Sequence, residues 1–144
     1  MTRQPALRVN VDAADWEAAN KLLRKAAPAV RKQMMKAVRE GVKRHVVPDA
    51  KRNASWSGRI PKSIGVSVTA REVKVQTRPN TAPHAGIMEF GGRHPVFGNR
   101  AVWVNQTARP FLGPAVNDNR DTVAKLVAQE TENAMRSVGF KPKG

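Results

Sequence analysis

The chain has 144 residues, 40% of them hydrophobic, with 26 Lys and Arg against 11 Asp and Glu for a net charge of +15, and it contains no cysteine. This composition predicts one domain over residues 1–144 with a real core, and it excludes disulfides, thiolate metal sites and cysteine nucleophiles. No apolar run is long enough for a membrane span or a signal peptide, and the excess charge favours nucleic acid or an acidic protein surface as a neighbour.

The N-terminal part alternates between a strand pattern and a helix pattern. Residues 7–12 alternate apolar and polar side chains, which predicts a short half-buried strand. Asp12 or Asp15 can then cap a helix over about 13–26. The apolar residues spaced for one face of that helix are Trp16, Ala19, Leu22, Leu23 and Ala26. We expect residues 1–6 and 139–144 to be flexible tails.

A second helix, predicted over about 28–53, shows the clearest periodicity in the chain. Its expected inner side carries Val30, Met34, Ala37, Val38, Gly41 and His45. The opposite side carries Lys32, Lys36, Arg39 and Lys43, which we call the basic stripe. Pro48 should kink the helix or end its regular part early. Two readings of the basic stripe stay open: a solvated helix face, or a contact with DNA or an acidic partner.

The remaining elements complete an expected α+β fold. Two alternating runs at 63–69 and 73–77 predict a hairpin after a loop at 53–61. A short helical turn is expected near 84–90, a short strand at 101–104, and a C-terminal helix over about 118–137, ended by Gly139. The predicted architecture is a small antiparallel sheet, made of the N-terminal strand, the hairpin and the later strand, packed with a long basic amphipathic helix and a C-terminal helix.

Residues 84–116 concentrate the large side chains of a chain that is only 5% aromatic. Met88, Phe90, Phe97, Trp103 and Phe111 alternate here with glycines and prolines. Such a segment consists of short pieces joined by fixed turns, so we expect its backbone conformation to be rigid. We expect Trp56 and Trp103 to act as core or interface anchors rather than as platforms for stacked bases.

The candidate catalytic and metal-binding side chains in the sequence do not favour an enzyme. His84, Glu89 and His94 have two imidazoles and one carboxylate, but their spacing fixes no metal geometry. Glu89 is either a buried carboxylate with a raised pKa, and then a catalytic candidate, or the partner of a nearby arginine such as Arg109 or Arg59, which we favour. The serines at 55, 57 and 63 have no adjacent base. We therefore assign no catalytic, cofactor-binding or metal-binding residue.

Three short motifs resemble a known family. They are SGRIPKSI at 57–64, HAGIMEFG at 84–91 and RPFLGPA at 109–115. In this order, between a basic helix and a C-terminal helix, they are similar to motifs of the tail-completion (head–tail joining, neck) family of long-tailed double-stranded DNA bacteriophages. The resemblance spans about 25–138. The residues that carry it are Gly58, Arg59, Ser63, Ile64, Glu89, Phe90, Gly91, Pro110, Phe111, Pro114 and Ala115. Gly92 stands where the family usually has Thr, and the insert 93–100 departs from the pattern.

The resemblance implies a structural virion protein at the head–tail junction, assembled in the host cytoplasm. It implies a ring, usually of six copies, that joins a head connector to tail-terminator or tail-tube proteins around the exiting DNA. No membrane and no cofactor are implied. The positive charge suits a ring threaded non-specifically by double-stranded DNA or seated on acidic rings. A small basic non-specific nucleic-acid-binding protein is the alternative function, and an enzyme is the third class.

Overall fold

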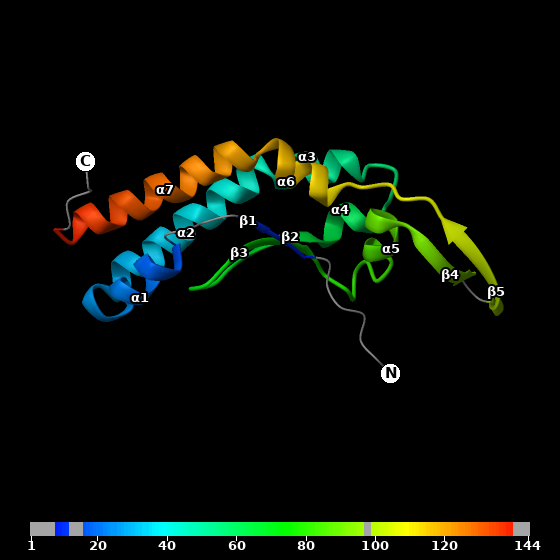
Figure 1. Cartoon of the computed structure of the whole chain (residues 1–144), viewed down its shortest axis with the longest axis horizontal. Coiled ribbons are helices and arrows are strands. Elements are labelled where there is room, and N and C mark those ends of the chain that lie inside the picture. The colour runs from blue at the N-terminus through cyan, green and yellow to red at the C-terminus, as the bar shows by residue number, and fades with distance from the viewer. Residues whose placement is uncertain (1–7, 12–15, 97–98, 140–144) are drawn as a thin grey trace.

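The computed structural model describes residues 8–11, 16–96 and 99–139, and its fold is α+β (Figure 1). The strands are β1 (Arg8–Val11), β2 (Ile64–Val68), β3 (Val73–Thr77), β4 (Gly92–Val96) and β5 (Asn99–Gln106). The helices are α1 (Trp16–Ala26), α2 (Pro28–His45), α3 (Val47–Asn53), α4 (Ile60–Ser63), α5 (Ala85–Phe90), α6 (Leu112–Asp118) and α7 (Arg120–Ser137). None of the helices in the described ranges is both long and apolar enough to cross a bilayer.

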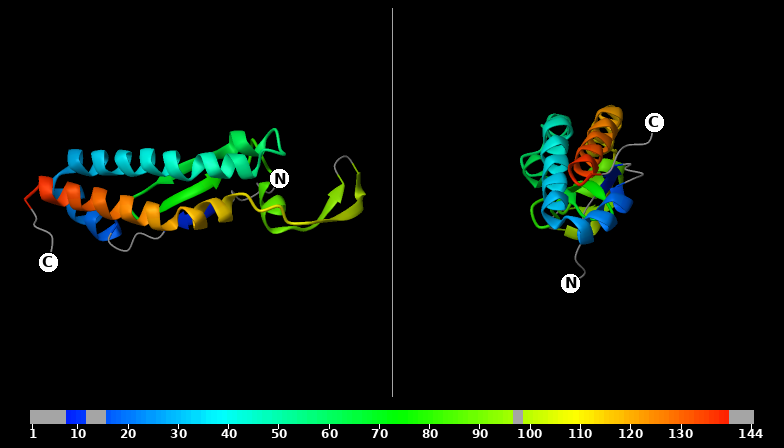
Figure 2. Two further views of the ribbon diagram at one scale, coloured as in Figure 1. Left: turned by 90° about the horizontal axis from the view of Figure 1, so that it is seen from above. Right: turned by 90° about the vertical axis from the view of Figure 1, so that its left-hand side faces the viewer.

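Two long helices form one layer of an elongated molecule. α2 and α7 lie side by side and run in opposite directions, and α1 packs against both at one end (Figure 2). Their contact is close at Gly41, where an added Cβ would overlap the side chain of Leu126. Gly41 therefore lies on the inner side of α2 as predicted, together with the buried Met34 and Val38.

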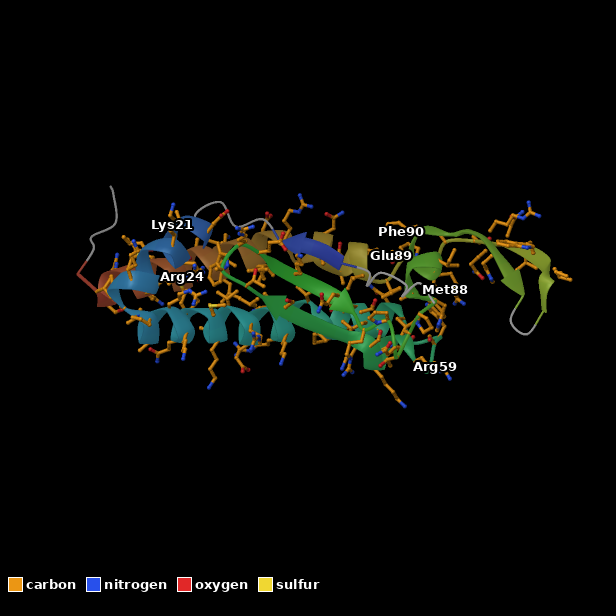
Figure 3. The ribbon with its side chains drawn as sticks, turned by 90° about the horizontal axis from the view of Figure 1, so that it is seen from below. Lys21, Arg24, Arg59, Met88, Glu89 and Phe90 are labelled. Carbon is orange, nitrogen blue, oxygen red and sulfur yellow. The ribbon has the colours of Figure 1, made fainter. Side chains whose placement is uncertain are left out.

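The second layer is an antiparallel sheet with strand order β1-β3-β2. Val66 lies opposite Val75, and Val68 lies opposite Val73, so the β2–β3 hairpin is confirmed. In β3, Val73, Val75 and Thr77 are buried while the alternate Lys74 and Gln76 are partly exposed. Figure 3 shows the molecule from the side of the sheet, with the long helices behind it. The sheet thus buries one face and leaves a polar face outward, as alternation requires.

Three elements differ from the prediction, each for a physical reason. The helix expected over 28–53 divides at Val46 into α2 and α3, because Pro48 has no N–H to continue the hydrogen-bond ladder. The prediction that the strand at 101–104 joins the main sheet is wrong, because β5 pairs only with β4 in a separate two-stranded sheet. The C-terminal helix begins at Arg120, because the separate helix α6 occupies Leu112–Asp118. The tails expected at 1–6 and 140–144, and Phe97, lie outside the described residues.

The inner face of α1 also differs from its prediction. Trp16, Ala19 and Leu23 are buried, and the indole N–H of Trp16 donates to the carbonyl of Thr69 at 2.8 Å. Leu22, however, is 41% exposed, and Ala26 is exposed as well. The apolar residues of α1 form two stripes rather than one, and only the first faces the core.

Candidate functional site

The second and third sequence motifs meet around the side chain of Glu89, which is buried near the end of α5. The N–H of Phe111 donates to Oε2 at 2.6 Å, and the N–H of Gly113 donates to Oε1 at 2.6 Å. The N–H of Leu112 lies 3.1 Å from Oε1 and 3.3 Å from Oε2. These three donors begin α6, and the next residue, Pro114, has no N–H. One carboxylate therefore satisfies every free N–H of that first turn.

Backbone contacts complete this region, which we call the junction: residues 88–91 against residues 106–113. The N–H of Arg109 donates to the carbonyl of Met88 at 2.6 Å. Gly91 has a φ of +75°, and an added Cβ would lie 2.9 Å from the carbonyl oxygen of Gln106 and 3.0 Å from the nitrogen of Ala108. Only glycine fits both the backbone angle and the space there. Gly92 follows with a φ of +142°, a backbone angle that strains any residue with a Cβ.

The side chains of Asn53 and Trp56 tie the end of α3 to the junction. Asn53 Nδ2 donates to the carbonyl of Phe111 at 3.1 Å, and Phe111 itself is fully buried. The guanidinium of Arg109 lies 4.1 Å from the centre of the Trp56 ring, which is a cation–π contact. The hypothesis that Glu89 pairs with Arg109 or Arg59 is wrong: among the described ion pairs none involves Glu89, whose acceptors are taken by backbone N–H groups.

The first motif forms a compact turn beside the junction. The hydroxyl of Ser57 accepts from the N–H groups of Arg59 at 3.3 Å and Ile60 at 3.1 Å, so it caps the short helix α4. The hydroxyl of Ser63 is buried and donates to the carbonyl of Ile60 at 2.7 Å. Ile64 is buried, whereas Gly58 and Arg59 are exposed. The serines of this motif hold a turn together, and none faces a base in the described contacts.

His84 lies directly before α5, which carries Glu89. Burial, and secondly the positive charge of Arg59, lower the pKa of the His84 imidazole from its ordinary value and so favour its neutral form. No three His, Asp or Glu side chains gather into a metal-binding group anywhere in the described ranges. Of the remaining motif residues, Ala115 is buried, Pro114 is half-buried and Pro110 is exposed.

The β4–β5 hairpin, residues 92–106, projects from the junction and is called the arm. It extends beyond the rest of the molecule at the end opposite α1 (Figures 1 and 2). Val102 is 46% exposed, Trp103 51% and Val104 40%, so apolar side chains are exposed on both faces of β5. The guanidinium of Arg93 lies 5.9 Å from the centre of the Trp103 ring. Phe90, at the root of the arm, is 74% exposed.

The four residues of the basic stripe are all exposed along α2, as predicted. Further exposed cations lie on the two neighbouring helices. They are Lys21, Arg24 and Lys25 on α1, and Lys51 and Arg52 on α3. Figure 3 places Lys21 and Arg24 at one end of the molecule and Phe90 toward the other. The cationic helices and the apolar arm are therefore separate surfaces.

Two features of the site were missed from the sequence. The start of α6 has Phe111 at its N-cap, a residue that cannot cap through its side chain, so an acceptor from elsewhere was required. That missing cap was the signal for an acceptor from another part of the chain, although it did not identify Glu89. The arm was hidden because its strands lie in a segment rich in glycine and proline, and one strand contains Pro95. Proline is tolerated in a strand at an unpaired edge.

Comparison with known proteins supplies one match. The family model HK97-gp10_like, described as "Bacteriophage HK97-gp10, putative tail-component", matches residues 17–91, just over half of the chain. The match runs from the first turn of α1 to the glycine that follows α5, so it includes the first two motifs and ends before the arm. No curated protein and no solved structure matches the chain.

Proposed function

Because this chain belongs to the HK97-gp10-like family of bacteriophage tail components and is thus a structural part of the virion, we propose that it forms a ring at the head–tail junction. The ring has six copies, joins the head connector to the tail-terminator or tail-tube proteins, and surrounds the channel through which the DNA leaves. The chain has no catalytic role in this proposal: it acts through its surfaces and its shape.

The arm is the observation that carries this proposal. An isolated two-stranded hairpin with apolar side chains on both faces is marginally stable in water, and exposed apolar patches of this kind mark protein contacts. A ring requires a heterologous interface, in which one patch meets a different patch on the next copy. A projecting arm at one end of an elongated subunit supplies one half of such an interface.

Loss of the protein tests the proposed role directly. A phage whose gene for this chain is deleted should produce DNA-filled heads and complete tails that stay separate, and supply of the intact chain in trans should restore joined particles. Electron microscopy of the lysate distinguishes these outcomes. Joined, infectious particles in the absence of the chain would refute its proposed role in joining heads to tails. Light scattering after size-exclusion chromatography, followed by negative staining, then measures the copy number.

The basic stripe has two possible partners in such a ring, DNA and an acidic neighbouring ring. We favour the acidic protein, because a channel that must release DNA gains little from a strongly attractive wall. The combined Lys32→Ala, Lys36→Ala, Arg39→Ala and Lys43→Ala variant should then fail to join heads to tails while its binding to duplex DNA keeps the same salt dependence. A matched control removes four other exposed cations: Lys62, Arg71, Arg120 and Lys125.

Non-specific nucleic-acid binding is the second candidate function, and the exposed cations of α1, α2 and α3 favour it. In that case the stripe variant should flatten the slope of log affinity against log salt by about one unit per lost phosphate contact. The intact chain should bind unrelated duplexes equally. Selective binding to one DNA sequence would contradict both candidates.

A further inference from the structure

We infer that the arm of one copy docks on the exposed face of α1 in the next copy, with Trp103 in the groove that Leu22, Lys21 and Lys25 line. The inference rests on the proposed function, because it names the two halves of the ring interface. The evidence is a pair of surfaces at opposite ends of the elongated molecule: the apolar arm at one end and an exposed apolar stripe of α1 at the other.

The exposed face of α1 has the shape and the chemistry of an acceptor. Ala18, Leu22 and Ala26 follow one another at helical spacing of four residues and form an exposed stripe that flanks the face carrying the buried Trp16 and Leu23. Among the described residues Lys21 and Lys25 also line this shallow, open groove of about 570 Å³, which has room for an aromatic side chain. The core uses only one apolar stripe of α1, and the second has no partner within the described part of the chain.

The exposed apolar residues divide between these two surfaces. Among the described residues the large hydrophobic side chains that are substantially exposed are Leu22, Phe90, Val102, Trp103 and Val104. Leu22 belongs to the α1 groove, and the other four belong to the arm or its root. Because the groove and the arm lie at opposite ends of the molecule, contact between them joins copies head to tail, and such contacts close into a ring when the rotation per copy allows it.

Charge fixes the orientation of the arm in the groove. Tryptophan is the best aromatic acceptor for a cation, so the lysines that flank the groove can lie over the indole ring of Trp103. Arg93 already lies on that ring and would repel the same lysines if it pointed at them. Glu17 is exposed one turn before Lys21. Docking with Arg93 beside Glu17 pairs opposite charges and keeps the like charges apart.

Cross-linking between copies tests this interface, and a chain without cysteine gives no background. One full-length preparation carries Ala18→Cys and a second, of different mass through a tag, carries Asn105→Cys, which leaves Leu22 and Trp103 in place. A short bismaleimide should yield the mixed dimer as the main product. A control preparation with Arg39→Cys, exposed on α2, should yield little mixed dimer with Asn105→Cys.

Affinity and charge reversal supply the second readout. Trp103→Ala should weaken self-association about 30-fold or more, as measured by sedimentation velocity, because it removes the central anchor. Glu17→Arg or Arg93→Glu alone should weaken it, and the double variant should recover part of the loss.

Three results would overturn the inference: a mixed dimer no stronger than the Arg39→Cys control, cross-links mainly between two arms, or no change on Trp103→Ala. The proposed function fails separately, when particles join without the chain. Rings that form at the head–tail junction without the Ala18–Asn105 cross-link would refute the docking mode and leave the proposed function intact.

Discussion

The junction and the arm are neighbours in the sequence and opposites in physical character. At the junction, residues from two motifs meet through a buried carboxylate and a backbone hydrogen bond, and a glycine lies close to the backbone of residues 106–108. The arm lies between these two motifs in the sequence and exposes apolar side chains on both faces. Because the junction holds its two ends together, the arm can vary in length and sequence at little cost to the rest of the fold. The buried contacts of the junction thus hold the base of the arm, and the arm presents an exposed apolar surface.

The largest effect should come from Phe111, whose side chain is fully buried at the junction. Phe111→Ala should lower the free energy of unfolding by about 3–5 kcal/mol, through lost burial and the cavity left behind. The matched control is Phe90→Ala, which changes the same residue type at a position that is 74% exposed. We expect the control to stay within about 0.5 kcal/mol. Urea unfolding followed by circular dichroism measures both, and equal losses would show that the buried and exposed phenylalanines of this region contribute alike.

Glu89→Ala should cost about 3 kcal/mol, because it leaves three N–H groups at the start of α6 without an acceptor. The physical reason is the lost cap, not a stranded arginine as the sequence had suggested. Glu89→Gln keeps the size and one acceptor oxygen, so its loss should be intermediate. Amide hydrogen exchange locates the damage: α6 should lose protection first. Faster exchange confined to the arm would contradict the capping role.

Gly91→Ala should cost about 2 kcal/mol, because alanine at a φ of +75° is strained and its Cβ meets the backbone of Gln106 and Ala108. Gly86→Ala is the control inside α5, the short helix that ends directly before Gly91, because an added Cβ there meets nothing within 4 Å. The control should be neutral or slightly stabilising, since alanine is the better helix former. A thermal melt separates the two variants. If both behave alike, the close approach of Gly91 to residues 106–108 does not clamp the arm.

The difference between local patterns and contacts distant in sequence explains how much of this structure the sequence could predict. Local periodicity located α2, the β2–β3 hairpin and α7, because each repeats its pattern over several residues. It could not show that Glu89 reaches residues 111–113, since a contact across more than twenty positions leaves no periodic trace. It placed Leu22 in the core because helical spacing identifies apolar stripes without saying which of two is buried. It joined the later strand to the wrong sheet, since strand patterns do not name their partners.

The smallest effect should come from the arm itself. Val102 and Val104 share one face of β5, and replacing both with Thr keeps the β-branched shape while removing exposed apolar surface. The free energy of unfolding of the dilute protein should change by less than about 0.5 kcal/mol, because each of these side chains keeps 40% or more of its surface exposed in the folded protein. Urea unfolding at low protein concentration measures this change. A loss above about 1 kcal/mol in dilute solution would mean that the arm packs on its own subunit, because only residues whose burial changes on folding contribute that much to the stability of a monomer. In that case the arm would belong to the same cooperative unit as the junction, and the division between a buried junction and an exposed contact surface would fail.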